Sequence, residues 1–164
     1  MISYQLRQRE YLLRISRAMT SRLDLPSLLR LILTSAADLV RAEAGLVALR
    51  SGQETNLTVH ASYGLPVSLL SRFTPLLTGI PVESKAYPIS DLQARLNLVT
   101  RAIRLPLHQV VALPLVIEER LLGVIYLFRS GSIAFSANDE DVLATFADQA
   151  AIAVRNAQLY QQVT

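Results

Sequence analysis

Apolar residues recur at helical spacing in the N-terminal quarter of the chain and predict two consecutive helices. The first helix covers residues 3–22, and its apolar face contains Leu12, Ile15, Met19 and Leu23. The second begins after Asp24, a typical N-cap residue. Pro26 is compatible with this start, because proline is tolerated in a first helical turn. It runs to about Arg41, with an apolar side formed by Leu28, Leu29, Ile32, Ala36, Leu39 and Val40.

The C-terminal part of the chain predicts a long helix over residues 137–162 with a narrow apolar stripe. Ser136 and Asp139 form a capping pair at its start, in which the hydroxyl accepts a backbone N–H and the carboxylate favours the positive helix end. The stripe consists of Leu143, Ala147, Ala150, Val154 and Ala157. Because most of these side chains are small, the helix axis is expected to lie close to the layer that it covers.

Between the terminal helices, the pattern predicts two β-hairpins separated by an irregular segment. The predicted strands cover residues 44–49, 57–63, 109–117 and 121–128. In the middle, residues 67–77 predict a short helix, residues 79–88 a loop with a brief strand, and Ile89 onward a helix that reaches Ile103. Antiparallel hairpins with helices at the ends predict an α+β fold, in which one sheet is covered by helices.

Composition and charge favour a single globular domain in the cytoplasm. The chain has 164 residues, of which 51% are hydrophobic, and this content excludes disorder. Its longest apolar run falls far short of the ~20 residues that cross a bilayer, and its N-terminus has no apolar signal-peptide core. The net charge is +3, but the arginines are scattered, so we expect no binding to nucleic acid.

Residue patterns that carry catalysis or bind metals are missing from the sequence. The chain has no cysteine, no glycine-rich phosphate loop, no Gly-x-Ser-x-Gly elbow and no His-Glu-x-x-His pair. His60 and His108 are its only histidines; either could ligate haem or a metal, but no spacing of His, Asp and Glu supplies the further ligands. We interpret both as strand or surface residues and expect neither a metal site nor enzymatic activity.

Short segments spread over residues 23–161 have the order and spacing of a known family. They include Leu28-Leu-Arg-Leu-Ile32, Ala42-Glu-Ala-Gly-Leu46, Tyr63-Gly-Leu65, Ala112-Leu-Pro-Leu115, Leu122-Gly-Val-Ile125, Phe135-Ser-Ala-Asn-Asp-Glu140 and Gln149-Ala-Ala-Ile-Ala153. Together they resemble the GAF domain, the small-molecule sensor module of signalling proteins. The resemblance covers nearly the whole chain.

The resemblance implies an architecture and an organisation. A single antiparallel sheet of five to six strands would have the N- and C-terminal helices on one face and short helices and loops on the other, where family members bind ligands. Residues 1–22 would form an N-terminal signalling or dimerisation helix, and residues 23–161 the GAF-like domain. The C-terminal helix would continue toward an output domain, such as a histidine kinase of a two-component system, in a longer protein.

Cofactors of known family members are not expected here. Bilin attachment and thiol chemistry depend on cysteine, which the chain lacks. Cyclic-nucleotide-binding members carry an Asn-Lys pair where this chain has Phe128 and Arg129, although Phe135, Asp139 and Glu140 are retained. We therefore expect no cyclic nucleotide, and we interpret Phe135 as a core aromatic and the two acids as part of a helix cap. An Arg129–Asp139 pair could keep a structural salt bridge.

Four polar residues flank the expected mouth of the ligand pocket: Asp91, Arg104, His108 and Gln109. Apolar pockets use a few such groups to orient a ligand, so these are the candidate binding residues. Asp91 could instead only cap its helix, and Arg104 could be an ordinary surface residue.

Two further apolar stripes lie outside the main core faces. They consist of Leu6 and Leu13 in the first helix, and of Ile152, Leu159 and Val163 in the last. Their spacing suits a helical seam between two subunits, and it equally suits packing of the first helix against the last within one chain. Two functions stay open: a small-molecule sensor whose homodimer relays a signal through its helices, or a ligand-free scaffold for dimerisation and signal relay.

Overall fold

The computed structural model describes residues 9–10, 13, 24–50, 56–80, 89 and 91–163. The first predicted helix, over residues 3–22, lies outside this part except for residues 9, 10 and 13, which are helical. The remaining elements follow in the order α2 (Leu25–Leu39), β1 (Ala44–Arg50), β2 (Leu57–Tyr63), η1 (Val67–Leu76), α3 (Leu92–Ala102), β3 (Gln109–Ile117), β4 (Arg120–Arg129) and α4 (Ala137–Val163). No helix among the described residues combines the length and apolarity needed to cross a membrane.

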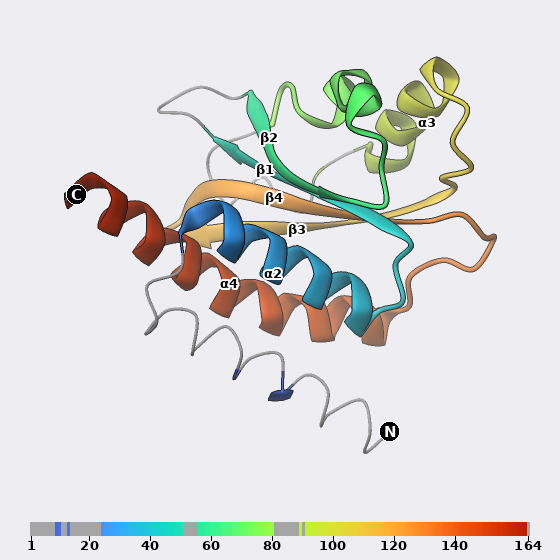
Figure 1. Cartoon of the computed structure of the whole chain (residues 1–164). Helices are drawn as coiled ribbons and strands as arrows, with labels where there is room; N and C mark the ends of the chain where they lie inside the picture. Colours follow the sequence, from blue (N-terminus) through green and yellow to red (C-terminus); the bar gives the residue numbers. More distant parts are fainter. Residues whose placement is uncertain are drawn as a thin grey trace.

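The strands form one antiparallel sheet in the order β2-β1-β4-β3, which confirms the predicted α+β class (Figure 1). In the described part of the chain the sheet has four strands, so the expectation of five to six is wrong for these residues. The sequence pattern itself supplies these four strands; the higher number comes from the family resemblance, and the described middle of the chain folds into the helices η1 and α3. The brief strand expected over residues 79–88 falls mostly on residues outside the description.

Helices α2 and α4 lie side by side on one face of the sheet (Figure 1). Their core includes Ile32 of α2, Val47 of β1 and Ile125 of β4, none of which is exposed. The alanine stripe of α4 is buried against this layer, as predicted, at Leu143, Ala147, Ala150 and Val154.

The predicted caps at the two long helices are confirmed. The backbone N–H and hydroxyl of Ser27 donate to Asp24 at 3.1 and 2.8 Å, which satisfies the start of α2. At α4, Asp139 N donates to Ser136 Oγ at 3.0 Å, and Ser136 N donates to Asp139 Oδ2 at 2.9 Å. This reciprocal pair is a capping box. The capping box thus fixes the point after β4 at which α4 begins.

Candidate functional site

The face of the sheet opposite α2 and α4 is expected to hold the ligand, and in the described residues apolar side chains pack against it. Phe73 of η1 and Phe128 of β4 are fully buried there, with their ring centroids 5.7 Å apart. Leu96 and Val99 of α3 are buried in the same cluster. Among the described residues, η1 and α3 thus form a roof over this face, and a second hydrophobic core lies between the roof and the sheet.

Hydrogen bonds link the roof to the sheet and link the two helices of the roof to each other. The hydroxyl of the fully buried Tyr126 donates to the backbone oxygen of Leu76 at 2.7 Å, which ties β4 to the end of η1. Arg95 of α3 donates to the backbone oxygens of Pro75 and Thr78 at 3.0 and 2.7 Å. The Tyr126 bond therefore fastens η1 to the sheet, and the two Arg95 bonds fasten α3 to the C-terminal end of η1.

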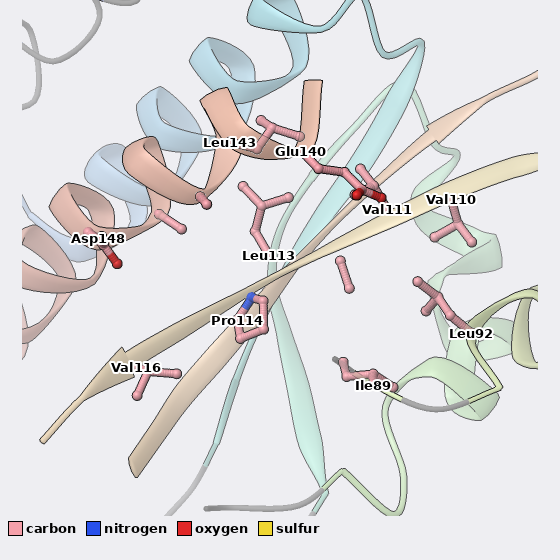
Figure 2. Close-up of a pocket in the computed structure, with 13 residues that line it drawn as sticks. Ile89, Leu92, Val110, Val111, Leu113, Pro114, Val116, Glu140, Leu143 and Asp148 are labelled. Atoms are coloured by element: carbon pink, nitrogen blue, oxygen red, sulfur yellow. The ribbon is translucent and has the colours of Figure 1, made fainter. Parts of the chain in front are cut away.

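A pocket of about 460 Å³ lies instead along β3, the edge strand of the described sheet (Figure 2). One wall is α4 and the other is the start of α3 with Ile89, which precedes it. Its lining consists of Ile89, Leu92, Val110, Val111, Ala112, Leu113, Pro114, Val116, Glu140, Leu143, Ala144, Ala147 and Asp148. This volume falls within the ~300–1,000 Å³ typical of small-molecule sites.

The pocket follows from the sequence of two elements. Strand β3 presents side chains to both layers: Val111 and Leu113 join the core under α4, whereas Val110 and Val116 pack against the core under α3. On α4, the lining residues Ala144 and Ala147 carry only a methyl group. Small side chains on the wall beside an edge strand leave space that larger residues would fill.

Two carboxylates are the charged groups of the pocket, and both come from α4. Glu140 and Asp148 are exposed and line the pocket with eleven uncharged residues. Glu140, Ala144 and Asp148 are four residues apart, so they follow one side of the helix. Sequence reasoning missed this site because it assigned Glu140 to the helix start alone. The site could have been recognised from Ala144, which has an acidic residue four positions before it and another four positions after it.

The four residues predicted to bind a ligand lie elsewhere. Asp91, Arg104 and His108 are exposed, Gln109 is half-buried, and none of them lines the edge pocket. Asp91 stands at the N-cap position of α3 with a left-handed φ of 56°, and its side chain makes no capping hydrogen bond. Gln109 Nε2 donates to the backbone oxygen of Ser132 at 3.4 Å. Their role in binding stays a prediction.

Arg129 joins the ends of three elements beside the start of α4. Its Nη2 lies 3.3 Å from Asp139 Oδ2, which confirms the predicted salt bridge, and also donates to the backbone oxygen of Val40 after α2. Its guanidinium carbon lies 4.1 Å from the ring centroid of Phe135, a cation–π geometry. The partly buried charge is therefore used in anchoring α4 to β4 and α2.

Neither histidine is part of a ligand cluster in the described residues. His60 in β2 and His108 before β3 are both exposed. Over this part of the chain, no three His, Cys, Asp or Glu side chains are grouped so that they could hold a metal ion.

Comparisons with known proteins agree on one domain type. The family model of the GAF domain matches residues 22–155. The GAF domain of a phosphoenolpyruvate-protein phosphotransferase from Acinetobacter is 16% identical, with a TM-score of 0.64 over 94% of this chain and 97% of that one. A methyl-accepting chemotaxis protein is 19% identical, with a TM-score of 0.58 over 92% of this chain and 98% of the compared segment. A bacteriophytochrome from R. palustris is 13% identical, with a TM-score of 0.70 over 99% of this chain and 39% of its own.

Proposed function

The chain belongs to the GAF domain family, and we propose that it is a non-catalytic sensory module of a signal-transduction protein. In this proposal a small molecule binds the pocket at the β3 edge, and the bound state is relayed through α4 to an output domain such as a histidine kinase. The observation that carries the proposal is the wall of the pocket: five of its lining residues belong to α4. The pocket is thus in direct contact with the helix that, in this proposal, carries the output.

The mechanism follows from how α4 is held. Its first turn is fixed by the capping box and by the Arg129–Asp139 salt bridge, whereas Ala144 and Ala147, further along, border the pocket. A molecule wedged between β3 and these alanines would push on the helix beyond its anchor. Because a ligand shifts a conformational equilibrium only by its differential affinity, it would favour the position of α4 that leaves room for it. The exit angle of the helix would then report occupancy.

In this proposal the length of α4 carries such a shift to the output domain (Figure 1). Helix α4 spans Ala137–Val163, and its C-terminal turns extend past the sheet toward the end of the chain. A small rotation near Ala147 is therefore carried by a rigid helix over several turns. We further propose that two copies pair through these helices, so that the rotation changes how the pair is packed.

A second candidate is a GAF domain that relays signals without a ligand. The packing under η1 and α3 favours it, since Phe73, Tyr126 and Phe128 are fully buried between the described roof and the sheet. In this case α4 would transmit changes made elsewhere in a longer protein.

Native mass spectrometry of the freshly purified chain discriminates the two candidates. The sensory proposal predicts a non-covalent adduct that is lost on denaturation. Ala144→Phe should abolish the adduct, because the ring fills the pocket from an exposed helix position. Thr145→Phe is the matched control: its position is exposed on the same helix but does not line the pocket, so the adduct should remain. A wild-type chain that is empty in every preparation would favour the scaffold.

A further inference from the structure

The two carboxylates of the edge pocket stand at its opposite ends. Glu140 and Asp148 are eight residues apart, so they are separated by about 12 Å along the axis of α4. Figure 2 shows Glu140 toward the Val110 end of β3 and Asp148 toward the Val116 end, with Leu113 and Leu143 between them. The groove thus has an apolar middle and a negative charge at each end.

No group of the protein neutralises these charges within the described part of the chain. Neither side chain takes part in a hydrogen bond or ion pair there, in contrast to the neighbouring Asp139, which binds Arg129. The other eleven lining residues are apolar, and none is basic. A molecule that fits the groove therefore meets apolar surface flanked by two carboxylates, and a positively charged group at each of its ends would complement them.

We propose that the groove binds a linear aliphatic diamine, with its methylene chain on β3 and an ammonium group at each carboxylate. This inference rests on the proposed function, because it names the ligand class of the same pocket. The methylene chain of the ligand would pack against Val111, Leu113 and Leu143, which removes apolar surface of both from water. The two ammonium groups would fix orientation and select against anions.

Three probes of equal chain length test the charge of the ligand, and a shorter diamine tests its length. Diaminooctane carries a positive charge at each end, octanediol is neutral, and suberate carries a negative charge at each end. Isothermal titration calorimetry on the full chain should give the tightest binding for diaminooctane. Diaminobutane, which is too short to reach both carboxylates, should bind more weakly. Raised salt should weaken the binding of diaminooctane more than that of the neutral octanediol.

Substitutions test whether the two carboxylates contribute to the affinity for diaminooctane. Glu140→Gln and Asp148→Asn should each weaken diaminooctane by about fivefold, the upper range for a solvent-accessible ion pair. Asp141→Asn is the matched control, because Asp141 is exposed on the same helix but does not line the pocket; it should leave the affinity unchanged. Ala144→Phe should abolish binding, whereas Thr145→Phe should preserve it. Circular dichroism checks that every variant keeps its fold.

The outcomes separate this inference from the function on which it rests. If octanediol or suberate binds as tightly as diaminooctane and Ala144→Phe removes that binding, the diamine assignment is overturned while the pocket remains a ligand site. If diaminooctane binds equally well to Glu140→Gln, Asp148→Asn and wild type, the assignment is again overturned. If no probe binds and native mass spectrometry finds no adduct, both the assignment and the sensory function are wrong.

Discussion

At the scale of single residues, the turn between β3 and β4 is made by an unusual pair. Glu118 and Glu119 have φ values of 52° and 65°, in the left-handed region. Hairpin turns of this kind favour Asn and Gly, because other L residues suffer a close contact between Cβ and the carbonyl oxygen. The hairpin was predicted, but the conformation of its turn could not be, since neither glutamate is a typical residue for it.

Replacing Glu119 by glycine should therefore stabilise the domain. Relief of the left-handed conformation outweighs the extra entropy of an unfolded glycine, so we expect a gain of about 0.5–1 kcal/mol in the free energy of unfolding. Urea denaturation followed by circular dichroism measures this. Glu119→Ala removes the same carboxylate but keeps the Cβ, and it should give no gain; equal stabilisation by both variants would contradict the conformational explanation.

The cap of α2 makes stability depend on pH. Hydrogen bonds from the Ser27 hydroxyl and backbone N–H lower the pKa of Asp24 below its ordinary value. A depressed pKa in the folded state means that Asp24 stabilises the fold above its unfolded pKa and that this contribution is lost as pH falls through the folded pKa. The difference in Tm between wild type and Asp24→Ala should thus be constant near neutral pH and shrink below about pH 4.

A neutral cap provides the control for this titration. The side-chain amide of the Asp24→Asn variant would accept the same backbone N–H without a titratable group, so its advantage over Asp24→Ala should persist at low pH. A wild-type advantage over alanine that does not change between neutral and acid pH would contradict the assignment to the carboxylate.

At the scale of elements, the close approach of β4 to β1 depends on a glycine. A Cβ at Gly123 would lie 2.2 Å from the backbone oxygen of Ala48, far inside contact distance. Gly123→Ala should therefore cost about 1–3 kcal/mol in the free energy of unfolding, as overpacking does. At Gly131 the nearest atom to such a Cβ is 4.0 Å away, so Gly131→Ala should change stability by less than about 0.5 kcal/mol. Equal effects at both positions in thermal denaturation would show that the contact is not rigid.

Elements with a strong local signal could be predicted from the sequence. Helix α4 follows from its capping box and from the spacing of Leu143, Ala147 and Ala150, and both hairpins follow from their apolar runs and turns. The 3₁₀ type of η1 could not be predicted, because the apolar spacing over its ten residues fits both a 3₁₀ helix and an α-helix.

The site was harder to predict because it depends on how elements meet. Whether a space remains under the roof is decided by the packing of Phe73 against Phe128, which are 55 residues apart in sequence. The edge pocket likewise brings together Leu92, Val110 and Ala144 from three elements. The local pattern of apolar and polar residues does not determine how close such distant residues lie in the folded chain.

At the scale of the whole molecule, apolar side chains remain on the outer side of α4. Ile152 and Leu159, two members of the predicted dimer seam, are 41% and 44% exposed. Leu13 of the other stripe is 52% exposed, whereas Leu6 and the side chain of Val163 lie outside the described residues. These exposed side chains are thus not buried within the described part of the chain, and the seam between subunits stays a prediction.

We expect the wild-type chain to be a dimer through this seam. Ile152→Glu combined with Leu159→Glu should convert it to a monomer, because burying two carboxylates in an apolar interface is costly. Size-exclusion chromatography with light scattering measures the mass. Leu98→Glu, at a similarly exposed leucine on α3, should leave the dimer intact. A wild-type monomer at high concentration, or dissociation by Leu98→Glu, would contradict the seam.

The most direct test of the sensory account is hydrogen–deuterium exchange of α4 when the pocket is filled. The aromatic ring introduced by Ala144→Phe acts as a built-in occupant, and the account predicts altered protection of the α4 amides after Ala147 and of β3, relative to both wild type and Thr145→Phe. Protection that is the same in all three proteins would contradict it, since a filled pocket would then leave the output helix unchanged.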